Sequence, residues 1–380
     1  MPRLLLLFIA ILFTRPAFLP VPVRAQEAPP VRAAVGDARL SLGGLVQGRF
    51  SYGRTDPAGA QDATERVGFG LRRARLRALA EVGRTSAFVQ VDGAGGTVQL
   101  VDAYAGFRLG ERVRLRVGRL AGAQPRSLIL TSSTRIDAVD RAAIAERWGR
   151  QTLGGDGRDF GLELRYGGRH AELLAFVHNG DGNWSRLRGN VRQGPSENDA
   201  TGGVSTSGLA VTLAAAWRPG APDGLEVGGF AGFNGSRNPN TRRDDDARGR
   251  DYVTYGAHAY WGAEPGSRAV RLKADVLGIV YAAPTRFEAR QHTFGAALLG
   301  ALRLHRAAEL FARAERFERD LDRPDTGDTY VTGGVSLSLS ALQGRPYHRE
   351  RLTLGYTAVL PDDDTAATHH LALLQLQIAF

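Results

Sequence analysis

The residues His369-His370-Leu371-Ala372-Leu373-Leu374-Gln375-Leu376-Gln377-Ile378-Ala379-Phe380 close the chain and alternate in polarity. Counting back from Phe380 to Ala372, every second residue is apolar, and the residues between them include Gln377 and Gln375. This period of two is typical of a β-strand with one face in hydrocarbon and the other in polar surroundings. Because the last strand of a membrane barrel must close against the first, the segment predicts an antiparallel transmembrane β-barrel.

The first 25 residues have the composition of an export signal. Arg3 precedes an apolar run, and a Pro-containing stretch then leads to Val23-Arg24-Ala25, which fits the cleavage site of a signal peptidase. A membrane anchor is the alternative, but the apolar run is shorter than a spanning helix requires. We therefore predict a signal peptide over 1–25, a periplasmic N-terminal segment over 26–38 and a barrel over 39–380 in the bacterial outer membrane.

The composition agrees with an exported β protein. The chain of 380 residues has no cysteine and 48 glycines, and after Ala25 no window approaches the ~20 apolar residues of a transmembrane helix. Without the three arginines of the predicted signal peptide, 46 basic residues face 39 acidic ones, a net charge of +7. Lys273 is the only lysine, so almost all positive charge is carried by arginine.

Alternating segments recur along the whole predicted barrel, separated in turn by short and by long polar connections. This alternation is typical of barrels with periplasmic turns and extracellular loops, and it disfavours a β-sandwich. We predict sixteen strands, at 39–52, 67–82, 86–92, 97–109, 113–120, 158–166, 170–178, 205–217, 225–233, 252–262, 268–280, 291–304, 308–318, 329–340, 349–360 and 369–380.

The longest predicted connection, 121–157, follows the fifth strand. Its residues Asp137 to Trp148 have helical character, and a loop of this length can fold into a wide barrel and narrow it. We predict that it forms a constriction; an extracellular lid is the alternative. The arginines expected at the constriction are Arg126, Arg135, Arg141 and Arg147.

Charged residues lie on one face of several predicted strands, opposite apolar residues. An arginine on the lipid face near the bilayer midplane costs about 2–4 kcal/mol, so these faces are expected to line a water-filled lumen. Guanidinium groups bind phosphate and carboxylate oxygens, and rings of positive charge favour anions. Pairing with Asp92, Asp102, Asp159 and Glu163 could cancel part of this charge. The residues predicted to line the pore are Arg73, Arg75, Arg77, Arg114, Arg116, Arg165, Arg271 and Lys273.

Several short segments follow one another in a distinctive order along the chain. They are Phe69-Gly70-Leu71-Arg72-Arg73-Ala74-Arg75-Leu76, Phe88-Val89-Gln90-Val91-Asp92 with Val101-Asp102-Ala103-Tyr104, Leu115-Arg116-Val117-Gly118-Arg119, Arg158-Asp159-Phe160-Gly161, Phe176-Val177-His178-Asn179-Gly180 and Glu309-Leu310-Phe311-Ala312-Arg313-Ala314-Glu315. In this order they resemble segments of the phosphate-selective porin O and P family. The resemblance implies a sixteen-stranded, usually trimeric, anion-conducting barrel, although the lysine-rich ladders of phosphate-specific members have no counterpart in a chain with one lysine.

Other functions find little support in the sequence. There is no G-x-S-x-G, no H-E-x-x-H and no compact Ser-His-Asp arrangement, so we predict no enzyme and no cofactor. The acidic runs 244–246, 320–328 and 362–364 lack the spacing of a calcium loop and are read as solvated loops. The arginines form no contiguous platform for nucleic acid.

The hypothesis is therefore a porin for passive diffusion of small anions, with phosphate or polyphosphate as candidate solutes. A general diffusion porin with weak ion preference, or a non-conducting structural or adhesive barrel, are the alternatives. The expected partners are small anions, outer-membrane lipids and lipopolysaccharide, the barrel-assembly machinery through Phe380, and two further copies in a homotrimer.

Overall fold

The computed structural model describes residues 31–59, 62–152, 157–180, 209–220, 224–235, 251–282 and 290–380. The predicted signal peptide 1–25, the start of the predicted N-terminal segment and the acidic run 244–246 lie outside the described residues. So do parts of the predicted loops 179–204, 234–251 and 281–290 and the start of the predicted strand 205–217.

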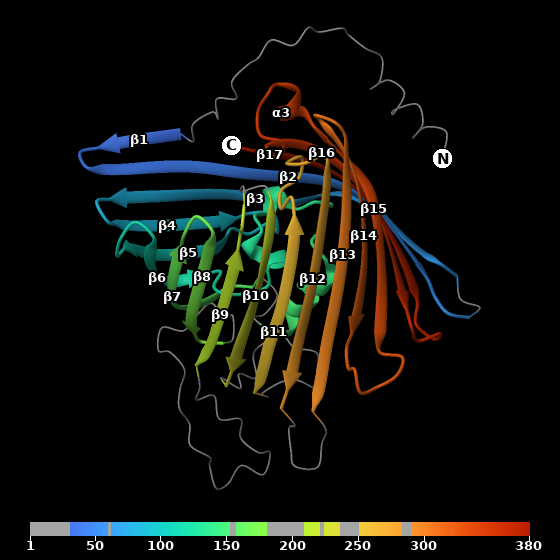
Figure 1. Ribbon diagram of the computed structural model, residues 1–380. Coiled ribbons are helices and arrows are strands. Elements are labelled where there is room, and N and C mark those ends of the chain that lie inside the picture. Colours follow the sequence, from blue (N-terminus) through green and yellow to red (C-terminus); the bar gives the residue numbers. More distant parts are fainter. Residues whose placement is uncertain are drawn as a thin grey trace.

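Sixteen antiparallel strands, β2 to β17, form a closed ring, as predicted (Figure 1). Each pairs with its neighbours in the sequence, and β17 closes the ring on β2 in a register that runs from Thr368 opposite Asp56 to Ala379 opposite Leu45. The strands are β2 (Ala38–Asp56), β3 (Thr64–Val82), β4 (Thr85–Asp92), β5 (Gln99–Arg108), β6 (Val113–Leu120), β7 (Asp159–Gly167), β8 (Ala171–His178), β9 (Ala210–Trp217), β10 (Leu225–Asn234), β11 (Tyr252–Trp261), β12 (Val270–Tyr281), β13 (Gln291–His305), β14 (Ala308–Glu318), β15 (Gly327–Ser338), β16 (Glu350–Pro361) and β17 (Thr368–Ala379).

One further strand, β1 (Val31–Val35), was not predicted. It pairs antiparallel with the start of β2, from Val31 opposite Leu42 to Val35 opposite Ala38. The turn between the two strands begins at Gly36, whose φ of 58° lies in the left-handed region that glycine occupies without a steric penalty. The segment before the barrel thus contains a hairpin strand that continues the sheet along β2.

The two faces of the wall differ as the period of two requires. In β17 the side chains of Leu374, Leu376 and Ile378 are 38–45% exposed, whereas Gln375 and Gln377 are buried at 1%. The same alternation in β12 exposes Val270 and Leu272 and buries Arg271 and Lys273. The outer face is therefore apolar and the inner face polar, as expected for a wall between lipid and a polar interior.

A register shift between β2 and β3 changes which arginines point inward. Gln47 lies opposite Arg73 and Gly48 opposite Leu71, so Arg72 is the extra residue of a β-bulge. The bulge lets two consecutive arginines reach the same side of the wall. Arg72 contacts Asp140 and Glu146 of the long connection, and Arg73 donates a hydrogen bond to Gln47.

The connection between β6 and β7 lies inside the ring, where Figure 1 shows it as the green helical segment. Its contacts reach strands on opposite sides of the barrel, because the Ser133 carbonyl accepts a hydrogen bond from Gln47 on β2 and the Trp148 indole N–H donates one to Thr254 on β11. It contains two short helical turns, η1 (Arg126–Leu130) and η2 (Ser133–Arg135), and a helix, α2 (Ala143–Thr152). We refer to residues 121–152 as the inner segment.

The helix begins later than the sequence indicated. The predicted helical stretch Asp137–Trp148 is helical only from Ala143 onward. Asp137 is engaged with Arg271 and Lys273, and Arg141 donates hydrogen bonds to the carbonyl groups of Leu128 and Thr131. These tertiary contacts hold residues 137–142 in an irregular conformation and override their helix propensity.

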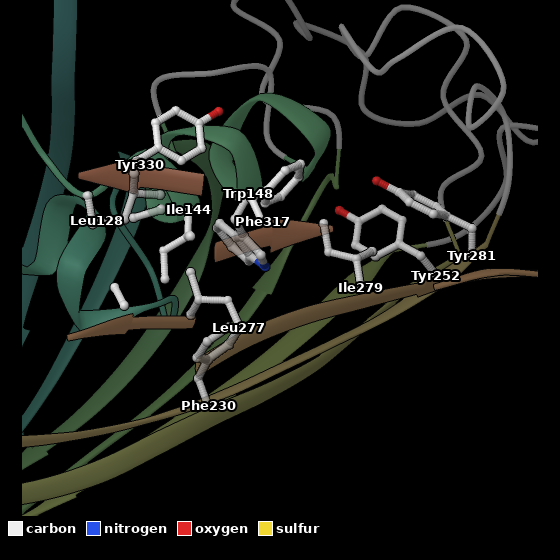
Figure 2. Close-up of a cluster of buried hydrophobic side chains, with 13 residues drawn as sticks. Leu128, Ile144, Trp148, Phe230, Tyr252, Leu277, Ile279, Tyr281, Phe317 and Tyr330 are labelled. Carbon is white, nitrogen blue, oxygen red and sulfur yellow. The ribbon is translucent and has the colours of Figure 1, made fainter. Parts of the chain in front are cut away.

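An apolar cluster fixes α2 on one half of the wall (Figure 2). Ile144 and Trp148 of α2 pack against residues of β10 to β15, and the Trp148 ring meets Phe230 edge to face at 5.4 Å. The Trp148 indole N–H donates to the Thr254 hydroxyl at 2.6 Å. The cluster comprises Leu128, Ala142, Ile144, Ala145, Trp148, Phe230, Tyr252, Leu277, Ile279, Tyr281, Ala297, Phe317 and Tyr330.

A short helix, α3 (Leu339–Leu342), lies in the connection between β15 and β16. In the described part of the chain, no helix has both the length and the apolar character that a membrane crossing requires.

The outward face of β13 offers a test of the apolar wall. We expect Leu298→Arg, at a side chain that is 59% exposed, to lower the free energy of unfolding in phospholipid vesicles by about 2–4 kcal/mol, because the charge would face lipid. Leu298→Ile is the matched control and should change the urea midpoint little. Equal midpoints for Leu298→Arg and the wild type would contradict the assignment of this face to lipid.

Candidate pore site

A cavity of about 480 Å³ lies between the inner segment and the wall formed by β2 to β7. Six arginines line it, together with one carboxylate, that of Asp102. They come from three wall strands or their ends and from the inner segment: Arg75, Arg77, Arg116, Arg141, Arg158 and Arg165. Four of these, Arg75, Arg77, Arg116 and Arg165, are among the residues predicted to line the pore.

Carboxylates partly neutralise these arginines. Arg75 pairs with Asp92 at 2.7 Å, Arg116 with Glu163 at 2.6 Å and Arg158 with Asp102 at 2.7 Å. Arg165 makes longer contacts, 3.4 Å to Glu163 and 3.7 Å to Glu172. Three of the four acids predicted to cancel lumen charge, Asp92, Asp102 and Glu163, therefore pair with cavity arginines, whereas Asp159 contacts His178 at 2.8 Å.

Two cavity arginines have no carboxylate partner in the described part of the chain. Arg77 forms no ion pair there and is exposed to the cavity. Arg141 is buried, and its guanidinium donates to the backbone carbonyl groups of Ser127, Leu128 and Thr131. A charge held only by carbonyl dipoles is not cancelled, so the cavity keeps an excess of positive charge.

The other predicted wall residues lie apart from this cavity. Arg73 is buried beside Gln47, and Arg114 is exposed at the short-turn end of β6, opposite Arg165. Arg271 and Lys273 lie on β12, across the barrel, and both are buried against the inner segment. The sequence pattern identified their inward orientation but not their distance from the cavity.

The carboxylate of Asp137, in the inner segment, forms ion pairs with both cations of β12. The carboxylate lies 2.6 Å from the Arg271 guanidinium and 2.6 Å from the Lys273 ammonium, and Arg271 also pairs with Glu309. Burial opposes ionisation of Asp137, but Lys273 and Arg271 outweigh it and hold the pKa of this carboxyl below its usual value. The only lysine of the chain thus tethers the inner segment.

The predicted constriction arginines take different partners. Arg126 pairs with Glu226 at 2.9 Å, Arg135 with Glu264, and Arg147 with Asp328 at 3.3 Å. Arg147 also donates to the Tyr330 hydroxyl at 3.0 Å. Of the predicted set, Arg141 alone lines the cavity, while the other three attach the inner segment to the wall.

Some charged residues of the interior were missed by the sequence analysis. Arg49 and Arg72 both contact Asp140, and Arg72 also contacts Glu146, at 3.3 Å in each case. The alternating pattern of β2 could have placed Arg49, since it lies two residues from Gln47. Arg72 could not be found this way, because only the bulge turns it inward.

Metal ligands do not gather in the described part of the chain, where no group of three or more His, Asp or Glu side chains could hold an ion. In the loop 319–326, Arg323 pairs with Asp320 at 3.4 Å. Asp362 in the loop after β16 is paired with Arg316.

A sixteen-stranded closed barrel with an apolar outer face, a charged interior and an inner segment defines the class of the outer-membrane porins. The chain belongs to the phosphate-selective porin O and P family, whose model matches residues 46–290. Family and fold indicate a channel rather than an enzyme, and they place it in the bacterial outer membrane. No curated protein sequence matches the chain.

Solved structures of porins have the same fold at low sequence identity. The anion-selective porin from Comamonas acidovorans superposes with a TM-score of 0.65 at 14% identity, covering 90% of this chain and 100% of that chain. DcaP, an outer-membrane channel of Acinetobacter baumannii, gives 0.58 at 12% identity and covers 91% and 99% of the two chains. OmpF of Salmonella typhi gives 0.58 at 13%, covering 92% and 100%.

The Asp137 tether can be tested by substitution. We expect Asp137→Asn to lower the free energy of unfolding by about 3–5 kcal/mol, because it leaves Lys273 buried without a partner. Asp322→Asn, in an exposed loop, is the matched control. Because the pKa of Asp137 is depressed, its contribution should persist above about pH 4, the usual carboxyl value, and disappear as pH falls further. Unchanged urea midpoints in detergent would contradict the tether.

Proposed function

We propose that this porin conducts small anions by passive diffusion, through the space between the inner segment and the wall of β2 to β7. The pore-lining residues of this proposal are Arg75, Arg77, Arg116, Arg141, Arg158 and Arg165. Arg73 and Arg114 extend the positive charge along the wall, while Arg271 and Lys273 hold the inner segment. Phosphate is one candidate solute.

The observation that carries the proposal is the charge balance of the cavity. Of the six guanidinium groups that line it, four are paired with carboxylates, whereas Arg77 and Arg141 have no acidic partner in the described residues. Their charge is permanent at any physiological pH. An anion entering the cavity exchanges part of its hydration for these groups, whereas a cation is repelled.

The apolar cluster around Trp148 supports the same path. It fills the space between α2 and the wall of β10 to β15, where few groups could replace the hydration shell of an ion. The arginine-lined cavity lies on the other side of the inner segment. Ions are therefore expected to pass beside the arginines.

Reconstitution in a planar bilayer tests the proposal. We expect the reversal potential in a KCl gradient to show anion selectivity, and the chloride current to fall as inorganic phosphate is added. Anion selectivity without a phosphate effect would leave an anion-preferring general porin. Cation selectivity would overturn the proposal, and absence of conductance would favour a structural barrel.

Removal of an unpaired cavity charge should weaken selectivity. A unit charge about 8 Å from an ion in water attracts chloride and repels potassium by roughly 0.5 kcal/mol each, so Arg77→Gln should lower the chloride-to-potassium permeability ratio about fivefold. Arg323→Gln, in an exposed loop far along the chain from the cavity, is the matched control. An equal effect of both substitutions would argue for net charge and against a local role of Arg77.

A further inference from the structure

Two aromatic rings lie on the inner wall among the arginines. Phe88 of β4 and Tyr104 of β5 face each other across the strands and stack, with ring centroids 5.1 Å apart and planes 28° from parallel. Both line the 480 Å³ cavity, and neither belongs to the cluster that holds α2. We refer to Phe88 and Tyr104 as the aromatic shelf.

Gly118 allows β6 to pass close to Tyr104. This residue lies opposite Tyr104 on β6 and has a φ of 133°, in the region that favours glycine. A Cβ atom there would lie 2.3 Å from the Ala103 carbonyl oxygen and 2.8 Å from the Tyr104 Cα. Position 118 therefore adds no side chain beside Tyr104, and the rings of Phe88 and Tyr104 keep part of their surface in the cavity.

Positive charge surrounds the shelf. The Arg116 guanidinium lies over the Tyr104 ring, 4.9 Å from its centroid, and is held there by Glu163. Arg77 is on β3, where the next inward residue, Leu79, pairs with Phe88. Arg77 has no ion pair in the described part of the chain and is therefore available to a ligand.

We propose that the shelf and its arginines form a binding site for organic anions with a flat apolar body, such as aromatic carboxylates. The carboxylate would pair with Arg77 and the ring would stack against Phe88 and Tyr104. This inference rests on the proposed function, because it names a substrate class for the same anion path.

The chemistry of the site separates this class from small inorganic anions. A cavity of about 480 Å³ falls in the range of sites for organic ligands, roughly 300–1,000 Å³. A hydrated phosphate gains binding free energy from contacts with the arginines, but it gains none from stacking on the rings. An aromatic carboxylate gains from both, through charge-assisted hydrogen bonds and ring stacking.

Block of the chloride current compares the affinity of the channel for an aromatic carboxylate with its affinity for small anions. The probes are benzoate, acetate and inorganic phosphate, added at neutral pH to the channel in a planar bilayer. Acetate has the same carboxylate without the ring, so the ratio of the half-blocking concentrations of acetate and benzoate reports the shelf alone. We expect benzoate to block at a concentration about two- to tenfold lower than acetate.

Substitutions show which residues cause the stronger block by benzoate. Phe88→Ala should bring the acetate-to-benzoate ratio close to one, and Phe88→Leu, which keeps an apolar side chain, provides a second variant if Phe88→Ala does not fold. Phe69→Ala, on the outer face where Phe69 is 88% exposed, is the matched control and should keep the ratio. Arg77→Gln should weaken block by both carboxylates.

The outcomes distinguish this inference from the proposed function. If the channel is anion-selective but acetate and benzoate block it equally, the proposed binding site at the aromatic shelf is wrong. The proposal that the channel conducts anions would still stand. A ratio that Phe88→Ala and Phe88→Leu both leave unchanged would also overturn the proposed binding site. Cation selectivity in the KCl gradient would instead overturn the proposed function itself, and the shelf with it.

Discussion

The pairing of β17 with β2 is the constraint on which the rest of the molecule depends. A strand in hydrocarbon cannot leave backbone N–H and C=O groups unpaired, so the sheet must close. Closure fixes the register from Thr368–Asp56 to Ala379–Leu45, and that register fixes which side chains face inward. Once one face is committed to lipid, the charged residues of every strand must lie on the other, and the charged interior follows from this division.

The interior is divided into two chemically different halves. On the side of β10 to β15, an apolar cluster and the Trp148–Thr254 hydrogen bond fix α2 to the wall. On the side of β2 to β7, arginines line a cavity. The Asp137 tether contributes to this arrangement, since it replaces water around two buried cations with a carboxylate. The inner segment therefore lies between an apolar half and an arginine-lined half of the interior.

Charge inside the barrel serves two purposes that residue type alone does not separate. Arg271 and Lys273 are neutralised by Asp137 and Glu309 and act as structural attachments. Arg77, in the same alternating pattern, has no such partner in the described residues. Only unpaired charge of this kind produces a field that a passing ion experiences at full strength, because paired groups present dipoles.

The sequence by itself determined the barrel, the sixteen strands of its wall, the orientation of the charged faces and a long connection after the fifth strand. It could do so because a period of two and a lipid-facing cost of charge are local properties of each strand. The tertiary structure alone decided that helix α2 begins at Ala143, that a bulge turns Arg72 inward, and which arginines meet carboxylates. These depend on contacts between residues far apart in the chain, such as Asp137 with Lys273, and no local pattern encodes them.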